Sequence, residues 1–250
     1  MPPVNFSQIA FPPSIMVTDQ EIDISALSEN QKRYYVDLFN ALTAFYTSQE
    51  KPRVIVGIAG PAGSGKSVIA SIFKMIARQV SLPFTVETVG IDGFHYPNEF
   101  LLSKMSEGKP LKDHKGRFDT YEVQKLTESL RRFSLGERVS FPAYSRKIHD
   151  PVPDAFFVEQ YEPTLLVIEG LWLLREEDGW NKVGAHLDFR IFIETNKEHI
   201  KEDLIKRHLR GGRNLADATT YYEENESKNY DLIVQTRNKA DKIIPTFYQE

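Results

Sequence analysis

The sequence of 250 residues contains no cysteine. Disulfide bonds, thiolate zinc sites and cysteine nucleophiles are therefore excluded, and this composition fits a reducing compartment. An excess of basic residues is also absent, because 31 lysines and arginines face 35 aspartates and glutamates, for a net charge of −4. The chain has no overall positive field to attract nucleic acid or an anionic membrane, so we expect neither as a partner. Any site for an anion has to be local.

Long apolar runs are missing as well. No stretch approaches the roughly 18 apolar residues that span a membrane. Residues 1–15 contain prolines but no cationic region followed by a sustained apolar core, which argues against a signal peptide. We therefore expect a cytoplasmic protein.

Segments with a strand pattern alternate along the chain with segments of helical periodicity. This alternation predicts an α/β fold with a doubly wound, mainly parallel sheet. The proline-rich segment 1–20 predicts an irregular arm, and the polar stretch 92–119 is long enough to be functional or locally helical. The segment 139–154 is interrupted by prolines and carries aromatic and charged residues. The predicted strands cover 53–59, 84–91, 164–168, 188–194 and 242–247, and the predicted helices cover 28–48, 68–80, 121–133, 196–210 and 216–238.

Two parts of the chain are expected: an N-terminal arm and helix packed on the core, residues 1–50, and a single larger domain, residues 51–250. In the helix at 28–48, Ser28 is well placed as the N-cap and apolar residues recur at helical spacing. Such a stripe favours packing against the domain and leaves a homodimer seam as the alternative. The stripe consists of Tyr35, Leu38, Phe39, Leu42 and Phe45.

A glycine-rich loop follows the predicted strand 53–59 and satisfies the pattern G-x-x-x-x-G-K-S/T of a phosphate loop. Its glycines allow several backbone N–H groups to turn inward, and the following helix directs its N-terminal dipole at the phosphates. Lys66 is expected to reach the β- and γ-phosphate oxygens, and the Ser67 hydroxyl to ligate Mg²⁺. The predicted nucleotide-binding loop consists of Gly60, Pro61, Ala62, Gly63, Ser64, Gly65, Lys66 and Ser67.

Two acidic residues stand at the carboxyl ends of predicted strands, where α/β sheets bind their ligands. Glu169 closes the apolar run 164–168, so it is a candidate for the Mg²⁺ shell, with an ordinary strand-end acid as the alternative. Asp92 follows the second predicted strand and is placed to accept the proton of a substrate hydroxyl. Taken alone, Asp92 is weak evidence, because Asp-Gly is a common turn pair.

Six segments occur in the order typical of the phosphoribulokinase/uridine kinase/pantothenate kinase family: GPAGSGKS, IDGFHYPN, HKGRFDTYE, FPAYSRKIHD, VIEGLW and NYDLIVQTRNKAD. The chain most closely resembles the bacterial-type pantothenate kinases and their sugar-kinase-like relatives. One departure is His95, which follows the DGF triplet where pantothenate kinases usually have leucine. The resemblance implies a P-loop NTPase (phosphate-loop kinase) fold with an N-terminal helical extension and a helical lid. It also implies ATP and Mg²⁺ as cofactors.

The same resemblance assigns roles to individual residues. Asp92 is expected to be the catalytic carboxylate, and Lys66 is expected to take part in catalysis as well. Glu169 is expected to be the acid beside the metal. The acceptor, a small molecule with a hydroxyl group, is expected to be surrounded by His95, Lys115, Tyr121, Tyr144 and Asn229. For Tyr121 and Tyr144, simple packing is the alternative.

The resemblance makes residues 206–213 a mobile lid. Its arginines Arg207, Arg210 and Arg213 are expected to neutralise the charge of the moving phosphoryl group, with Arg207 and a further residue, Arg237, assigned to the nucleotide. The alternative for the lid segment is a solvated basic helix face, because Lys206, Arg207 and Arg210 lie within one helical turn.

The predicted function is transfer of the γ-phosphoryl group of Mg·ATP to a hydroxyl of a sugar, a nucleoside or a pantothenate-like molecule. A second hypothesis is an ATP-binding regulatory module without phosphotransfer, for which a proton acceptor beside the phosphates would be superfluous. A third is a GTPase or nucleic-acid translocase. It is disfavoured because we expect no guanine-reading N-K-x-D segment and no broad basic surface.

Overall fold

The computed structural model describes residues 2–246 and is built around a sheet of five parallel strands. The strand order is β11-β10-β3-β9-β4, so β3, which leads into the glycine-rich loop, is central. These strands bear out the predicted alternation of strands and helices. They are β3 (Arg53–Ala59), β4 (Thr85–Gly90), β9 (Thr164–Gly170), β10 (Phe189–Glu194) and β11 (Lys242–Pro245).

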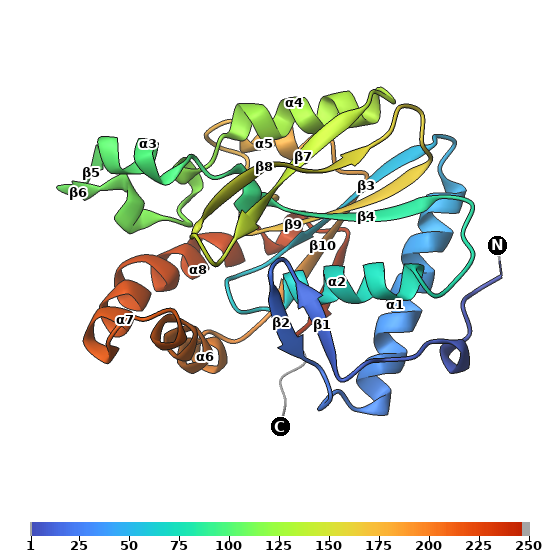
Figure 1. Cartoon of the computed structure of the whole chain (residues 1–250), viewed down its shortest axis with the longest axis horizontal. Helices are drawn as coiled ribbons and strands as arrows, with labels where there is room; N and C mark the ends of the chain where they lie inside the picture. The colour runs from blue at the N-terminus through green and yellow to red at the C-terminus, as the bar shows by residue number, and fades with distance from the viewer. Residues whose placement is uncertain (1, 247–250) are drawn as a thin grey trace.

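Helices cover both faces of this sheet, as Figure 1 shows, and the fold is the predicted doubly wound one. Side chains of β3 alternate between two cores: Val54, Val56 and Ile58 pack with α1 and α2, whereas Ile55 and Ala59 pack on the side of α4 and α5. This alternation follows from the two-residue period of a strand. The helices are α1 (Glu29–Ser48), α2 (Lys66–Ala77), α4 (Val123–Ser134) and α5 (Trp180–Gly184).

A helical segment beside the phosphate loop follows β10 (Figure 1). The predicted helix 196–210 is found, with Asn196 as its N-cap, whereas the predicted helix 216–238 is divided by a π-helical turn. The pieces are α6 (Lys197–Arg210), α7 (Leu215–Tyr221), the π-turn Tyr222–Glu226, α8 (Ser227–Val234) and a 3-10 turn, Arg237–Lys239.

Helix α1 confirms both expectations for its segment. The Ser28 hydroxyl accepts a hydrogen bond from the Gln31 N–H, and the Gln31 side chain accepts one from the Ser28 N–H, which is a complete capping box. The apolar stripe lies inside the chain's own core, with Tyr35, Leu38, Phe39 and Leu42 all buried. The stripe therefore packs on the domain and is not available as a dimer interface. A homodimer remains a prediction, but it would have to use another surface.

The N-terminal arm is not irregular, which corrects the prediction for residues 1–20. After a 3-10 turn (Phe6–Gln8), it forms an antiparallel hairpin of β1 (Ser14–Val17) and β2 (Gln20–Asp23). We call this element the N-terminal hairpin. The prolines Pro12 and Pro13 precede β1 and do not interrupt it, and β1 is too short for its alternation to stand out in the sequence.

Residues 139–154 also contain regular structure that the prolines concealed. They belong to a two-stranded antiparallel sheet of β7 (Val139–Ser145) and β8 (Asp150–Val158). The pairing shifts register between Phe141 and Ala143, around Pro142. A two-stranded sheet has only edge strands, so its prolines need not break a ladder on both sides.

The polar stretch 92–119 was expected to be functional or locally helical, and the structure shows that it is locally helical. It contains 3-10 turns Ile91–Phe94, Leu111–His114 and Phe118–Thr120, helix α3 (Asn98–Ser103), and the short strands β5 (Met105–Ser106) and β6 (Lys109–Pro110). Predicted boundaries shift slightly elsewhere: α2 begins at Lys66, and β11 ends at Pro245, with Phe247 outside the described residues. Among residues 2–246, no helix is both long and apolar enough to cross a membrane.

Candidate active site

The glycine-rich loop joins the carboxyl end of β3 to the first turn of α2. Gly63 and Gly65 have φ angles of 78° and 88°, in the left-handed region that glycine adopts without strain. Space is also limited, since a Cβ on Gly63 would lie 3.3 Å from the Cβ of Ile200 in α6. The loop therefore has the backbone shape that the phosphate-loop pattern predicts, with α6 packed against it.

Lys66 is buried at the start of α2, with 7% of its surface exposed. Its Nζ donates a hydrogen bond to the Pro61 carbonyl oxygen at 2.7 Å. Burial lowers the pKa of Lys66 to about 8, although the nearby carboxylates of Glu169 and Asp92 act in the opposite direction. A buried ammonium with a neutral hydrogen-bond partner gains from an anion brought next to it, as a phosphate would be.

Ser67 and Glu169 meet between α2 and the end of β9. The Ser67 hydroxyl donates a hydrogen bond to Glu169 Oε1 at 2.8 Å. Burial raises the pKa of Glu169, while Lys66 opposes the rise. Gly90, the register partner of Glu169 on β4, leaves room for the carboxylate, because a Cβ there would lie 3.0 Å from Oε1. Two hard oxygen donors side by side fit the preference of Mg²⁺.

Asp92 lies in the 3-10 turn directly after β4, on the same edge of the sheet. The Tyr121 hydroxyl donates a hydrogen bond to Asp92 Oδ1 at 3.2 Å, and an Arg146 guanidinium nitrogen lies 3.9 Å from Oδ2. Burial acts to raise the pKa of Asp92, but the neighbouring His95, the charges of Arg146 and Lys66, and the Tyr121 hydroxyl together lower that pKa below its usual value. Asp92 is therefore a carboxylate at neutral pH.

His95 and Tyr121 lie against Asp92 and are both buried. Burial lowers the pKa of His95 to about 4, so the ring is neutral at pH 7. Its Nδ1 is 2.9 Å from the Thr120 carbonyl oxygen, its Nε2 is 3.8 Å from Asp92 Oδ1, and the ring stacks on Tyr121 with centroids 3.8 Å apart. These contacts show that His95 and Tyr121 hold the Asp92 side chain in place. Substrate binding by either residue remains a prediction.

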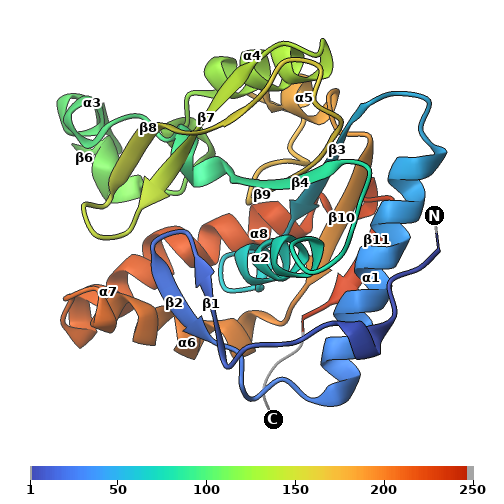
Figure 2. The same cartoon turned by 45° about the vertical axis from the view of Figure 1, so that its right-hand side comes forward.

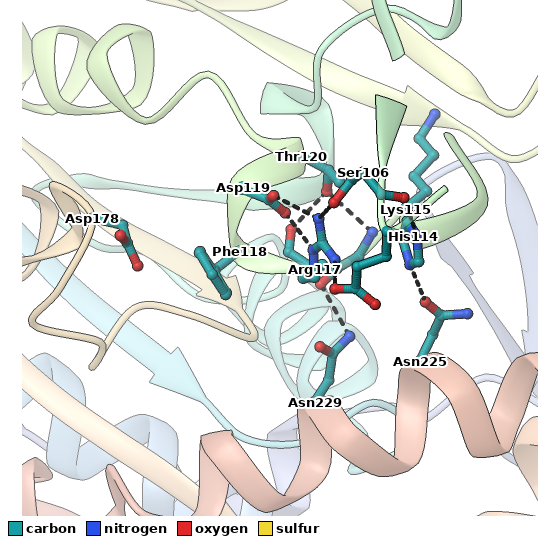
Figure 3. Close-up of polar contacts among 12 residues, drawn as sticks. Ser106, His114, Lys115, Arg117, Phe118, Asp119, Thr120, Asp178, Asn225 and Asn229 are labelled. Atoms are coloured by element: carbon teal, nitrogen blue, oxygen red, sulfur yellow. Dashed lines mark hydrogen bonds and ion pairs between the residues drawn. The ribbon is translucent and has the colours of Figure 1, made fainter. Parts of the chain in front are cut away.

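The loop from Ser106 to Thr120 carries Lys115 and faces the C-terminal helices, as Figure 3 shows. Lys115 Nζ donates to Asn98 Oδ1 and to the His149 carbonyl oxygen, both at 2.9 Å, and lies 4.9 Å from the centre of the Tyr144 ring. Asn229 Nδ2 donates to the Gly116 carbonyl oxygen at 3.4 Å. The structure thus brings Lys115 and Tyr144 together and places Asn229 against the backbone of the same loop.

The three lid arginines have different surroundings. An Arg207 guanidinium nitrogen lies 2.9 Å from Glu226 Oε1, and the Arg213 guanidinium lies 3.8 Å from the centre of the Tyr221 ring. Arg210 is exposed at the end of α6. Of the three, Arg207 is near enough to lower the pKa of Lys66, after the larger effect of burial.

Arg237 is the remaining predicted nucleotide residue. Its Nε lies 2.6 Å from Glu194 Oε1, at the carboxyl end of β10. Glu194 lines a cavity of about 470 Å³ together with Thr195, Asn196 and Thr246. The Thr246 hydroxyl donates a hydrogen bond to the Ser64 carbonyl oxygen at 3.2 Å, so this cavity adjoins the phosphate loop.

A larger cavity of about 850 Å³ borders α2, beginning at Ser67. Ser67, Asp92 and Glu169, which come from the ends of three different chain segments, all line it. Tyr144 and Arg146 of the β7–β8 hairpin line it as well. The predicted catalytic carboxylate and the two predicted metal-side residues therefore share one cavity, whereas Lys66, Arg210 and Arg213 do not line it.

Two residues next to the site were not singled out from the sequence. Arg146 lies beside Asp92, and the Tyr221 hydroxyl donates a hydrogen bond to the Lys115 carbonyl oxygen at 2.7 Å. Arg146 belongs to the segment FPAYSRKIHD, so the resemblance offered a signal for it. Tyr221 is one of two adjacent tyrosines in a helix, and only the fold brings it to Lys115.

Contrary to the expectation from the sequence, the chain contains an N-K-x-D run, at 238–241. The run precedes β11, and the Asp241 carboxylate accepts a hydrogen bond from the Arg190 N–H at 2.8 Å. Arg190 lies near the start of β10, whereas the phosphate loop lies at the carboxyl ends of the strands. Asp241 thus holds two strands together at the opposite end of the sheet from the phosphate loop.

Comparison with known sequences decides the family. The pattern of the "Phosphoribulokinase / Uridine kinase family" matches residues 55–250. The chain belongs to this family. Phosphoribulokinases, uridine kinases and pantothenate kinases phosphorylate alcohol groups, and the chain is assigned to this class of enzyme.

Individual relatives agree with the family. The chain is 30% identical over 232 residues to the uncharacterised protein YggC of Escherichia coli (strain K12), covering 92% of this chain and 94% of that protein. It is also 30% identical to a pantothenate kinase of Histophilus somni (strain 129Pt), covering 78% of this chain but only 62% of that kinase. A crystal structure from Silicibacter sp. TM1040, named as a candidate fructose transport system kinase, superposes with a TM-score of 0.72 at 26% identity, covering 84% of this chain and 98% of that one.

Proposed function

We propose that the protein is an ATP-dependent kinase that transfers the γ-phosphoryl group of Mg·ATP to a hydroxyl of a small metabolite. The proposal rests above all on one observation. A carboxylate kept ionised, Asp92, lines the same cavity as Ser67 and Glu169, directly beside the phosphate loop. A nucleotide sensor needs the phosphate loop but has no use for this carboxylate, so the arrangement favours catalysis over regulation.

The nucleotide is assigned to the phosphate loop and to the adjoining smaller cavity. Backbone N–H groups of the loop and Lys66 would bind the phosphates, as expected for a phosphate loop. Arg237, held by Glu194 at the edge of the smaller cavity, would lie near the rest of the nucleotide. Ser67 and Glu169 would hold Mg²⁺, which when bound neutralises charge on the phosphates.

In the transfer step, Asp92 accepts the proton of the acceptor hydroxyl. The hydroxyl oxygen forms a bond to the γ-phosphorus while the bond from that phosphorus to the bridging oxygen breaks, and ADP leaves. Lys66 offsets negative charge on the leaving phosphate, and we assign the same role toward the moving phosphoryl group to Arg207, Arg210 and Arg213. Arg146 and the Tyr121 hydroxyl keep Asp92 ionised and oriented.

The acceptor is assigned to the larger cavity, within reach of Asp92. Tyr144 lines this cavity and would orient polar groups of the acceptor, with Lys115 over its ring and His95, Tyr121 and Asn229 behind them. The relatives are named for pantothenate, uridine and fructose, so their names leave the acceptor open among a pantothenate-like molecule, a nucleoside and a sugar.

An assay of ADP release coupled to NADH oxidation tests the proposal. Purified protein with Mg·ATP is screened against pantothenate, uridine, D-fructose and D-glycerate. At least one acceptor should raise ADP release above the rate without acceptor, and Lys66→Ala should abolish the increase. No increase with any acceptor, in a protein that binds Mg·ATP, would favour the regulatory module instead.

A further inference from the structure

The outer wall of the larger cavity comes from outside the part of the chain that matches the family. Phe11, Ile15, Met16 and Thr18 of the N-terminal arm line it, opposite α2 and the β7–β8 hairpin. The family match begins only at residue 55. A cavity that holds the proposed catalytic residues on one side is therefore completed on the other side by the N-terminal hairpin.

A single carboxylate attaches this wall to the catalytic side. Asp19, in the turn of the N-terminal hairpin, accepts hydrogen bonds from the Ser145 hydroxyl at 2.8 Å and from the N–H groups of Arg146 at 3.1 Å and Lys147 at 3.3 Å. In Figures 1 and 2 the tip of the N-terminal hairpin lies beside the turn between β7 and β8 in both views. Three hydrogen bonds to one charged group make this the strongest polar contact described between the two hairpins.

This attachment leads directly to the catalytic carboxylate. Arg146, whose N–H is bound by Asp19, extends its guanidinium to within 3.9 Å of Asp92 Oδ2. Asp19 therefore fixes the backbone from which Arg146 reaches Asp92. Asp19 itself does not line the cavity, so it acts through Arg146 and through the placement of the hairpin.

The two ends of the cavity differ in chemistry. At the Asp92 end, the lining groups are charged or polar: Ser67, Asp92, Arg146 and Glu169. Toward the N-terminal hairpin, carbon-rich side chains such as Met16, Met75 and Phe156 line it. Three polar side chains also line the cavity beside them: Lys74 is paired with Glu87, the Gln79 amide is hydrogen-bonded to the Ala10 backbone, and Arg78 is the third. A polyhydroxylated acceptor would place hydroxyl groups without partners against the carbon-rich side chains, which is unfavourable. An acceptor with an apolar body beyond its reacting hydroxyl fits better.

We propose that the acceptor site extends beneath the N-terminal hairpin, where it takes the apolar body of an alcohol whose hydroxyl lies at Asp92. Asp19 is the positioning residue that closes this wall. The proposal rests on the proposed kinase function for the identity of the ligand. The closure of the wall by Asp19 does not depend on that function.

The closure can be measured without any activity, because the chain has no cysteine of its own. Ser71, on α2, lines the cavity, so Ser71→Cys introduces a single thiol of nearly the same size there. Adding Asp19→Ala should raise the rate of its alkylation by N-ethylmaleimide about tenfold, since charge-assisted hydrogen bonds that hold the wall are lost. Asp19→Asn should give an intermediate rate, because the amide oxygen still accepts.

Asp23→Ala is the matched control, because Asp23 lies on the same hairpin, accepts a backbone hydrogen bond from Ser25, and does not line the cavity. It should leave the alkylation rate of the thiol unchanged. Equal rates in the Asp19→Ala and Asp23→Ala backgrounds would overturn the role of Asp19.

The ligand class is tested by steady-state kinetics with the same four acceptors. Pantothenate or uridine, which carry apolar surface, should have a higher kcat/KM than D-fructose or D-glycerate. With the best of the four, Asp19→Ala should raise the acceptor KM about tenfold and leave the ATP KM unchanged. A preference for D-fructose or D-glycerate, or an equal rise in both KM values, would overturn the assignment.

A lack of turnover with all four acceptors would refute the proposed function and the ligand class together. The alkylation rates would still decide whether the hairpin closes the cavity.

Discussion

Replacing Asp92 by asparagine tests the division of labour between the two acidic residues. Asp92→Asn keeps the size of the side chain, and its oxygen can still accept the hydrogen bond that the Tyr121 hydroxyl now donates at 3.2 Å. What is lost is the negative charge beside Arg146, at 3.9 Å, and the ability to take a proton. A positioned general base contributes about 10²- to 10⁴-fold. We therefore expect kcat to fall by that factor, about 3–5 kcal/mol in activation free energy.

Glu169→Gln should have a different effect, because Glu169 accepts the hydrogen bond of the Ser67 hydroxyl at 2.8 Å and is assigned to the Mg²⁺ shell. Its amide has no charge to attract the cation. The Mg²⁺ concentration for half-maximal activity should rise severalfold in Glu169→Gln and stay unchanged in Asp92→Asn.

Both variants are compared in the ADP-release assay over a series of Mg²⁺ concentrations. Asp119→Asn is the control, since Asp119 pairs with Arg117 and does not line the larger cavity. A shifted Mg²⁺ requirement in Asp92→Asn together with an unchanged one in Glu169→Gln would reverse the assignment. Wild-type turnover in both variants would refute the mechanism.

Three further predictions concern single charges. Mg·ATP at a hundredfold excess over its Kd should stabilise the protein by about 2.7 kcal/mol, and a thermal shift equally large in Lys66→Ala would show that the loop does not bind phosphates. Arg210→Ala and Arg213→Ala should each lower kcat by about 10³-fold with little loss of ATP binding, whereas unchanged turnover would make the segment a solvated basic face. Because burial lowers the pKa of Lys66 from 10.5 to about 8, the ammonium destabilises the nucleotide-free fold below pH 8, and this cost disappears as the pH rises from 8 to 10.5. Lys66→Met should therefore be more stable than wild type at pH 7 by about 3 kcal/mol in urea unfolding, with the difference shrinking toward pH 10.5.

Much of the fold could be predicted because its strongest signals are local. The segment 53–59 is apolar after Arg53 and rich in β-branched residues, and the structure gives β3 the same bounds. The start of helix α1 depends on the capping box between Ser28 and Gln31, and the rest of the helix shows in its apolar stripe. Both signals lie within the segment itself. The phosphate loop has the same character, since its glycines are required by the backbone angles of the loop itself.

The parts that escaped prediction depend on contacts distant in sequence. The N-terminal hairpin is short, and its turn is fixed by hydrogen bonds between Asp19 and residues more than 120 positions away. The β7–β8 hairpin reads as a proline-broken loop until its register shift at Pro142 is seen. Arg146 comes to Asp92 through the β7–β8 hairpin and Tyr221 comes to Lys115 from the end of α7, so beyond the motif that contains Arg146 their positions along the chain gave no signal for a site.

The central claim is that the protein transfers a phosphoryl group to an alcohol with Asp92 as the proton acceptor. The most direct measurement incubates the protein with Mg·ATP radioactively labelled at the γ-phosphate and the four acceptors, and then separates the products. The label should appear in a phosphate ester of one acceptor with wild type and be strongly reduced with Asp92→Asn. Label found only in ATP or inorganic phosphate, from a protein whose thermal shift proves that Mg·ATP is bound, would contradict the account.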